Sequence, residues 1–390
     1  MKEDYFVICE KIIKEVHNMI VMDISIDNFF AFKNFHMNMS YPKKIVDSYI
    51  EEEFLRNRPN FRYKKVNIIM GANATGKTSF GRMMMRIFNF MDTKQYEKIT
   101  SSVCDNKKEA RFSMDFITDE YAMYRIATII EPKSGDKYKS SDIKVCLKKV
   151  DINLKDNYES CSKRLDNIIS EEGSNYIDEL EKIQGLSWRF EYPAEKPQVY
   201  DVPTKNVERY LHILENTLKA LDPAIQKVEK IDVVENAFVL RMKNQDIIIQ
   251  DGKVIDTEIL SSGTKAGIAV ASFVSSIIDG DYGFYYCDEK FSYIQSDVEK
   301  AFLSVMISCL QTDGQLFFTT HNTDILDLPL PKHSFVFLKK DCEDVEQPIK
   351  CVSASQFLKR NTDSLRNAVD NDLFSAAPSV DMIYEIVDFK

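Results

Sequence analysis

The chain has 390 residues, of which 44% are hydrophobic and 29% charged, a composition typical of folded globular proteins rather than disordered ones. At about 100–200 residues per domain, this length predicts two or three lobes. The formal net charge is −10. Proteins whose whole surface binds a nucleic-acid backbone are usually basic, so this charge argues against nucleic-acid binding as the dominant surface property and leaves room only for a local basic groove.

The eight cysteines are scattered without a Cys-x-x-Cys pair, and with only five histidines the sequence lacks the spacing of a zinc site. Reduced thiols of a cytoplasmic protein are the better interpretation. No segment approaches the roughly 18 consecutive apolar residues that a spanning helix needs, and the acidic N-terminus does not look like a secretory signal. We therefore expect a cytoplasmic protein without membrane contact.

Residues 1–21 carry apolar side chains at helical spacing and predict an N-terminal helical extension. From Met22 the pattern alternates as in a half-buried strand. A short apolar strand at residues 65–70 precedes a glycine loop and a helix, and residues 110–150 predict further strands separated by turns. Together these elements predict an N-terminal lobe over residues 22–154.

Residues 155–225 are mostly helical in pattern, with long polar faces, and predict a helical insertion. We expect this insertion either to dock a partner or to form a solvated lobe over the sheet. Strands then return, a helix opens after residue 264, and two apolar strands at 283–288 and 315–320 flank a long helix. The C-terminal lobe is expected to cover residues 226–390, which makes the fold class α/β.

The loop after the first apolar strand reads GANATGKT and matches the phosphate-binding pattern G-x-x-x-x-G-K-[ST]. Glycines let backbone N–H groups surround a phosphate, and the following helix directs its N-terminus at the anion. Lys77 is expected to reach the β- and γ-phosphates, and the Thr78 hydroxyl to coordinate Mg²⁺. The predicted nucleotide-binding residues here are Gly71, Asn73, Ala74, Thr75, Gly76, Lys77, Thr78 and Ser79.

Residues 283–289, GFYYCDE, form an apolar strand that ends in two adjacent acids. Asp288 is placed at the C-terminal end of that strand, where α/β sheets bind ligands, and is expected to hold Mg²⁺ directly or through water. Glu289 is the natural general base for an attacking water. An apolar strand followed by Asp-Glu is also common for purely structural reasons, but the phosphate loop in the same chain favours the catalytic interpretation. A second buried strand, QLFFTTHN, ends at His321.

These motifs, in this order, resemble the ABC-type ATPase heads of the SMC, RecF and OLD families. The segment ISIDNFFAFKNF resembles the opening I-x-N-F-x-x-F of that group, and the phosphate loop resembles its G-x-N-x-x-G-K-[ST] form. LSSGTK at residues 260–265 resembles the signature L-S-G-G-E, in the form found in short OLD-like ATPases of anti-phage defence systems (the retron-associated, Septu and PARIS kind). CDE and TTHN correspond to the Walker B strand and the switch histidine, and residues 364–380 resemble a terminal segment of those ATPases.

The resemblance covers roughly residues 22–382 and implies an ABC-type P-loop ATPase head. Such a head has a mixed sheet flanked by helices, an antiparallel β subdomain and a helical insertion. It implies ATP and Mg²⁺ as cofactors and Glu289 and His321 as catalytic residues, with His321 near the γ-phosphate. Ser261 and Gly263 would contact ATP bound to a second copy, so that two heads enclose the nucleotides in a homodimer or a higher homo-oligomer. The alternative for LSSGT is an ordinary helix start, with Ser261 or Ser262 as N-cap.

Two positions depart from the family pattern. The D-loop after Glu289 usually contains an aspartate, but residues 290–295 here read KFSYIQ. This departure puts coupling between the two nucleotide sites in question. A Q-loop glutamine has no clear place among the strands after residue 110.

The resemblance implies a regulatory or sensor subunit of a prokaryotic anti-phage system that controls a separately encoded, nuclease-like effector through ATP-dependent assembly. The tail after His321 lacks a nuclease pattern such as VEGxxD, and we expect it to complete the ATPase lobe. One alternative is a RecF- or SMC-like ATPase for DNA repair or recombination that clamps DNA. Another is a non-catalytic scaffold whose assembly is controlled by ATP.

Overall fold

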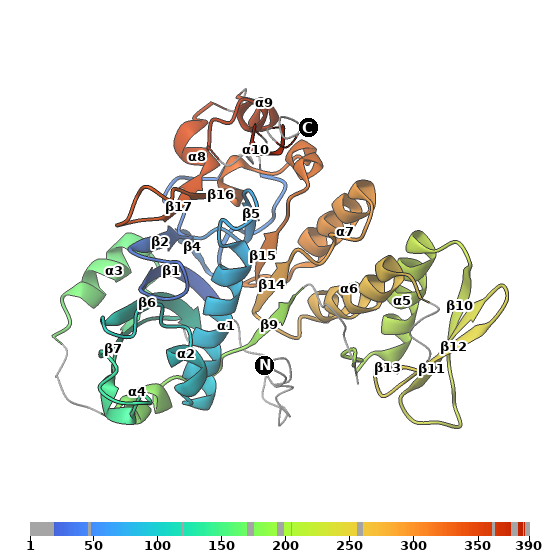
Figure 1. The fold of residues 1–390 in the computed structure, drawn as a ribbon, viewed down its shortest axis with the longest axis horizontal. Helices are drawn as coiled ribbons and strands as arrows, with labels where there is room; N and C mark the ends of the chain where they lie inside the picture. Colours follow the sequence, from blue (N-terminus) through green and yellow to red (C-terminus); the bar gives the residue numbers. More distant parts are fainter. Residues whose placement is uncertain are drawn as a thin grey trace.

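The computed structural model has three adjoining parts: an antiparallel sheet, a central mixed sheet with helices on both faces, and a small lobe at one side (Figure 1). The described residues are 19–45, 48–118, 121–169, 175–192, 199–203, 205–255, 260–360, 363–375, 381–384 and 386. The predicted helical extension over residues 1–21 therefore lies largely outside them. Its last residues, 19–21, are not helical, because strand β1 begins at Met19 and its buried apolar side chains pair with β6.

The first sheet is antiparallel throughout, in the order β2-β1-β6-β7-β8. Its strands are β1 (Met19–Asp27), β2 (Phe35–Asn38), β6 (Ala110–Thr118), β7 (Ala122–Ile130) and β8 (Ile143–Asp151). A hairpin of β3 (Phe54–Leu55) and β4 (Arg58–Arg62) stands beside it. One face of the sheet packs against helix α1 (Lys77–Thr93) in a shared apolar core. This confirms the antiparallel β subdomain that the resemblance to ABC-type heads implies.

The central sheet is mixed, in the order β17-β16-β5-β15-β14-β9. Its strands are β17 (Ile349–Ser353), β16 (Phe335–Lys340), β5 (Val66–Met70), β15 (Gln315–Thr319), β14 (Phe284–Asp288) and β9 (Trp188–Glu191). All neighbours are parallel except β17, which runs antiparallel to β16. Every residue of β5, β14 and β15 is buried, as expected for parallel strands covered on both faces.

Alternate residues of these strands pack into two different cores. Tyr286 and Phe317 face α1 and the first sheet. Tyr285 and Phe318 face α6 (Ser262–Asp279) and α7 (Ser296–Cys309), which cover the other side. Because a parallel strand buried on both faces favours apolar residues at successive positions, this sandwich explains the continuous runs FYYC and LFF within β14 and β15.

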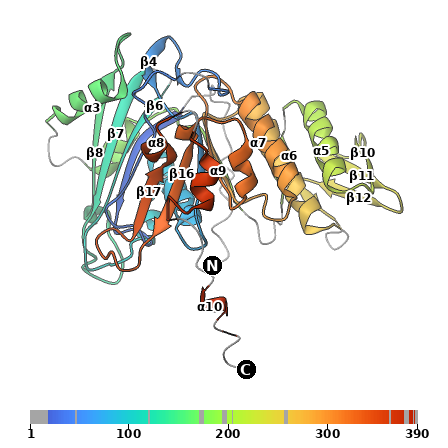
Figure 2. The same ribbon diagram turned by 90° about the horizontal axis from the view of Figure 1, so that it is seen from above.

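The small lobe combines α5 with a four-stranded antiparallel sheet, in the order β10-β11-β12-β13. Its elements are α5 (Val207–Leu221), β10 (Ile225–Lys230), β11 (Ala237–Met242), β12 (Asp246–Gln250) and β13 (Lys253–Val254). Figure 2 shows α7, α6 and α5 side by side, with the small sheet outermost. The contact between α5 and α6 is close, because a Cβ at Gly267 would lie 2.5 Å from the Leu221 side chain. The lobe is therefore attached to the body through α6.

The segment 155–225, expected to be a helical insertion, does not form one unit. Helices α3 (Tyr158–Asp166) and α4 (Tyr176–Glu181) pack on the first sheet. Strand β9 follows them and forms an edge of the central sheet, where it pairs with β14. Only α5 leaves the body, and its lobe continues past residue 225 into strands β10–β13. Local helical periodicity was correct for these helices, but it carried no information on where each helix docks.

The remaining elements are short helices and 3-10 turns. They are α2 (Glu97–Thr100), α8 (Ala354–Phe357), α9 (Leu365–Asp370), α10 (Asp381–Tyr384) and the 3-10 turns η1 (Ser140–Asp142), η2 (Thr323–Asp327) and η3 (Lys332–Ser334). Phe374, just after α9, stacks on Phe337 of β16 at 4.1 Å between ring centroids. Arg366 of α9 forms a bidentate ion pair with Asp327. None of the helices in the described part of the chain is both long and apolar enough to cross a membrane.

Candidate functional site

The predicted phosphate loop lies between β5 and α1 and has the backbone that its glycines allow. Gly71 has φ 151° and Gly76 has φ 102°, both in the region that favours glycine. A Cβ at Gly71 would stand 2.4 Å from the Leu338 carbonyl oxygen of β16, so no larger residue fits. Asn73 and Ala74 are exposed at the loop tip, while Thr78 and Ser79 are partly exposed in the first turn of α1.

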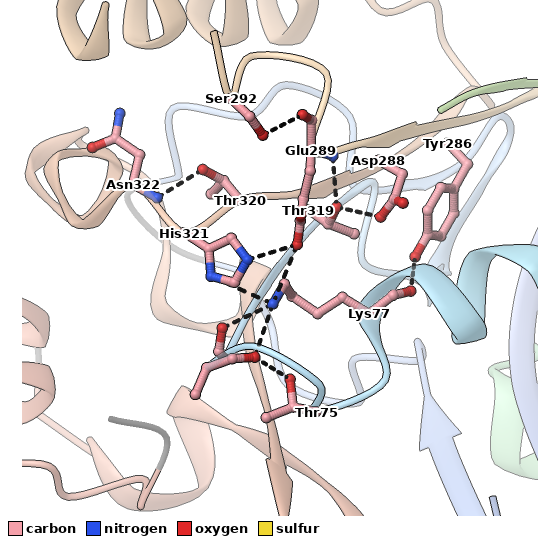
Figure 3. A network of polar contacts seen from close by, with 12 residues as sticks. Thr75, Lys77, Tyr286, Asp288, Glu289, Ser292, Thr319, Thr320, His321 and Asn322 are labelled. Carbon is pink, nitrogen blue, oxygen red and sulfur yellow. Dashed lines mark hydrogen bonds and ion pairs between the residues drawn. The ribbon is translucent and has the colours of Figure 1, made fainter. Parts of the chain in front are cut away.

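Lys77 turns back over this loop (Figure 3). Its Nζ donates to the carbonyl oxygens of Gly71 (2.9 Å) and Ala72 (3.1 Å), and Thr75 Oγ1 donates to the same Ala72 oxygen at 2.8 Å. The lysine side chain is only 3% exposed. Burial lowers the pKa of Lys77, while the charge of Glu289 opposes that shift. The ammonium group is thus held inside the loop that the sequence predicts to bind phosphate.

Asp288 ends β14 and is fully buried beside the first turn of α1. Its Oδ1 accepts a hydrogen bond from Thr319 Oγ1 at 2.6 Å. Burial raises the pKa of Asp288, and hydrogen bonds from the Thr319 and Thr78 hydroxyls oppose that shift. Its other oxygen, Oδ2, is buried and finds no hydrogen-bond partner among the described residues.

This unsatisfied oxygen fits the predicted Mg²⁺ ligand. A buried carboxylate oxygen normally has a partner, and a divalent cation held by Asp288 and the Thr78 hydroxyl would supply one. No group of three or more His, Cys, Asp or Glu side chains gathers for a metal in the described part of the chain.

Glu289 meets His321 and Lys77 at one point. Its Oε1 lies 2.8 Å from His321 Nε2 and 3.3 Å from Lys77 Nζ. The hydrogen bond from His321 lowers the pKa of Glu289, burial opposes the shift, and the Lys77 charge adds to it. The backbone of Glu289 is left-handed, with φ 42°, and its N–H donates to both oxygens of Thr319. Lys77 follows β5, His321 follows β15 and Glu289 follows β14. Because these parallel strands are neighbours in the order β5-β15-β14, their C-terminal ends bring the nucleotide-binding residue Lys77 beside the predicted catalytic residues Glu289 and His321.

The sequence analysis missed Tyr286 and Gly81. Tyr286 Oη donates to the Lys77 carbonyl oxygen at 3.1 Å, so it supports the first turn of α1 from below. The tyrosine ring fills the space beside Gly81, where a Cβ would approach it to 2.5 Å. A glycine within the strongly helical pattern after the phosphate loop was the available indication of such close packing.

The structure does not bring Ser261 and Gly263 to the phosphate loop of the same chain. They begin α6, which packs on the face of the central sheet opposite α1. Ser261 is exposed, and its Oγ caps the helix by accepting from the Thr264 N–H at 3.0 Å. The N-cap interpretation is therefore confirmed. An exposed cap at a helix N-terminus also remains accessible to an anion brought by another molecule.

Comparison with known proteins shows which fold the chain has. No family model and no curated protein matches the chain. Among solved structures, an SMC head bound to the C-winged helix domain of ScpA matches with a TM-score of 0.50 at 14% identity, over 87% of this chain and 99% of that chain. The fold is that of an ABC-type ATPase head. Two further structures match less well. The SMC head domain from Thermotoga maritima has a TM-score of 0.44 at 12% identity, over 85% of this chain and 98% of that chain. The recombination mediator protein RecF has a TM-score of 0.40 at 12% identity, over 86% of this chain and 99% of that chain.

In this ABC-type head, the two departures from the family pattern have definite positions. Residues 290–295, in place of a D-loop with aspartate, follow β14 directly, and Lys290 is buried rather than exposed. The strand beside β14 is β9, which ends in Glu191 and is followed by Tyr192. In the part of the chain that the structure describes, no glutamine stands in β9 or directly after it up to Tyr192.

Proposed function

We propose that this chain binds ATP together with Mg²⁺ and hydrolyses it to ADP and phosphate. The observation that carries the proposal is the meeting of Lys77, Glu289 and His321 at the mouth of the phosphate loop. One cation, one carboxylate and one imidazole within hydrogen-bond distance of each other supply both charge neutralisation and a group that orients water. Hydrolysis of a phosphoanhydride depends mostly on such positioning and electrostatic stabilisation.

Each residue has a distinct role in this proposal. The loop N–H groups and the N-terminus of α1 bind the phosphates, and Lys77 neutralises the charge on the γ-phosphate. Asp288 and Thr78 would hold Mg²⁺, which supplies further neutralisation of the phosphate oxygens when bound. Glu289 orients the attacking water and accepts its proton, and His321 donates a hydrogen bond toward the γ-phosphate.

Lys77 and Glu289 contact each other and neighbouring groups in the structure. Lys77 Nζ is occupied by two loop carbonyls and by Glu289, and Glu289 is occupied by His321. A phosphate entering the loop competes for Lys77, which frees the Glu289 carboxylate for water.

Removal of the divalent cation tests the activity of the wild-type chain. We expect ATP turnover in the presence of Mg²⁺ and its loss in excess EDTA, because without the cation Lys77 alone offsets the charge of the triphosphate and the Asp288 carboxylate repels it. Release of phosphate measured under both conditions checks this, with restoration by added Mg²⁺ as control. A chain that binds ATP but releases no phosphate in Mg²⁺ would support the scaffold alternative and contradict the proposed hydrolysis.

The proposal includes a second copy of the head. Ser261 and Gly263 lie away from their own phosphate loop, at an exposed helix N-terminus suited to a phosphate. We expect ATP to bring two heads together so that these residues contact the γ-phosphate of the partner. A homodimer or a larger homo-oligomer should therefore form in ATP.

Two substitutions at Ser261 separate capping from phosphate contact. Aspartate and asparagine both replace serine as N-caps, but only Ser261→Asp places a negative charge against the triphosphate. We expect Ser261→Asp to weaken ATP-dependent assembly and turnover at least about tenfold, because like charges facing each other cost several kcal/mol. Ser261→Asn should be affected much less. Light scattering with ATP checks assembly, and equal behaviour of the two variants would argue against the contact in trans.

We extend the proposal to a regulatory subunit of an anti-phage defence system that controls a separately encoded, nuclease-like effector. The form of the LSSGT segment and the likeness of residues 364–380 to short defence ATPases support this extension. Co-purification with the products of the neighbouring genes tests it, and a solitary gene without a co-purifying partner counts against it. ATPase activity that DNA stimulates in a salt-sensitive manner would instead favour the DNA-clamping alternative.

A further inference from the structure

A buried lysine follows the proposed catalytic glutamate. The side chain of Lys290 is only 4% exposed, and its Nζ lies 2.7 Å from Glu191 Oε1. The same Nζ donates to the Tyr192 carbonyl oxygen at 3.0 Å. Both partners belong to the end of β9, the edge strand next to β14. The loop after Glu289 is therefore tied to the neighbouring strand by a charged side chain that points into the protein.

Stability alone does not account for this ion pair. Taking an ammonium and a carboxylate out of water costs several kcal/mol per ion, and apolar residues of similar size often serve a fold equally well. A geometric role is the better explanation, because a hydrogen-bonded ion pair fixes direction and distance in a way that apolar contacts do not. Because Lys290 directly follows Glu289, the ion pair holds the peptide group between these two residues in position.

The backbone of Glu289 needs such support. Its φ of 42° lies in the left-handed region, which costs free energy for a residue other than glycine. On one side, its N–H is bound by the Thr319 carbonyl and hydroxyl oxygens of β15. On the other side, the Lys290 side chain reaches across to β9. The catalytic glutamate is held between both neighbours of β14.

The charged contacts continue from β9 to the helix that begins with Ser261. Arg189 is buried in β9, and its guanidinium donates to Ser272 Oγ (2.8 Å) and to the Ser272 carbonyl oxygen (3.2 Å) of α6. It also lies 3.8 Å from Glu191 Oε2 and 3.2 Å from Asp201. At the start of α6, Gly263 packs against the loop after Glu289, since a Cβ there would lie 3.2 Å from the Tyr293 carbonyl oxygen.

We infer that Lys290 is a positioning residue for Glu289, and that Glu191 and Arg189 connect that position to α6. This inference rests on the proposed ATPase activity and gives the altered D-loop a function. Movement of α6 when a second head arrives is transmitted to the Glu289 peptide through two routes, the Gly263 contact and the Lys290–Glu191–Arg189 chain. Turnover depends on this chain, whereas ATP binding at the phosphate loop does not.

The test compares turnover with binding in variants of matched size. Lys290→Met keeps the length of the side chain and removes the charge. We expect kcat per folded molecule to fall between about tenfold and a hundredfold, since a displacement of about 1 Å in a catalytic group can cost that much. The Kd for ATP, measured by calorimetry, should stay within about threefold of the wild-type value. Lys290→Arg, which keeps the charge and can still reach Glu191, should recover part of the lost turnover.

A double variant separates positioning from stability. Lys290→Met leaves the Glu191 carboxylate without its lysine, so the single variant is expected to unfold at a lower temperature. In Lys290→Met/Glu191→Gln the lost partner charge is also removed, so thermal stability should largely return while kcat stays low. Lys64→Met serves as the control, because Lys64 is buried to a similar degree but lies before β5, remote from the site. The exposed fraction of the whole residue is 6% for Lys64 and 5% for Lys290.

Four results would overturn the inference. If Lys290→Met keeps the wild-type kcat, the lysine does not position Glu289. If turnover returns with stability in the double variant, or falls equally in Lys64→Met, the pair is a structural element only. If the wild-type chain itself releases no phosphate, the proposed function fails, and the inference fails with it. That last outcome is recognised before any variant is made.

Discussion

Lys77→Ala is expected to lower the affinity for ATP by about a hundredfold. Each hydrogen bond to a charged group contributes about 1.5–3 kcal/mol. The substitution removes the ammonium group that lies inside the loop, where it donates to the carbonyl oxygens of Gly71 and Ala72. It also removes the bridge between the loop carbonyls and Glu289, so the empty loop loses part of its support. Isothermal titration calorimetry with ATP in Mg²⁺ measures the loss.

The control for this substitution lies on the same helix. Arg82 is an exposed residue of α1, one turn and a half along from Lys77, and Arg82→Ala removes a positive charge without touching the loop. It should leave ATP affinity unchanged. If Lys77→Ala binds ATP with the affinity of the wild type, the loop does not bind the triphosphate, and its assignment as the nucleotide site is wrong.

Glu289→Gln is expected to separate binding from hydrolysis. Glutamine has the shape of glutamate and can still accept a hydrogen bond from His321 or donate to water, but it cannot take a proton. A positioned general base contributes about 10²–10⁴-fold to a rate, so turnover should fall by a factor in that range. ATP affinity should be retained, because the loop, Lys77 and Asp288 are unchanged.

The same variant should accumulate the assembled form. If two heads separate only after hydrolysis, Glu289→Gln with Mg-ATP stays at the mass of the assembly while the wild type returns to the monomer. Light scattering over time distinguishes the two. Glu179→Gln, at a buried glutamate that pairs with Lys182 far from the site, is the control for loss of a carboxylate. Unchanged turnover in Glu289→Gln would remove Glu289 from its proposed role.

The central strands could be predicted from sequence because their patterns are local. Residues 283–288 and 315–320 were expected as strands and appear as β14 and β15, and the alternating segments after residue 110 appear as β6 to β8. Strand order could not be predicted, because the pairing of β5 with β15 joins segments far apart in the chain. The strand IQKVEK, β10, shows no period-two alternation, because its buried residues Ile225 and Val228 are three positions apart and the pairing register shifts between Ile225 and Lys227.

The site shows the same division. The residues of the phosphate loop and the pair Asp288 and Glu289 are consecutive, so a motif identifies them without the fold. Glu191 and Lys290 are neighbours only because β9 pairs with β14, and β9 lies within the segment 155–225 that was expected to form a helical insertion. Contacts that depend on a short edge strand leave no periodic trace in the sequence.

Strand β9 also gives the protein a built-in optical reporter. Trp188 is the only tryptophan of the chain and begins that strand. Its half-buried indole lies 6.1 Å from the Phe88 ring of α1 and 5.6 Å from that of Phe190, measured between ring centroids. Intrinsic fluorescence therefore comes from one position, in contact with the helix that follows the phosphate loop and three residues before Glu191. Changes at either place are visible in the emission of the unlabelled protein, without a dye or an engineered residue.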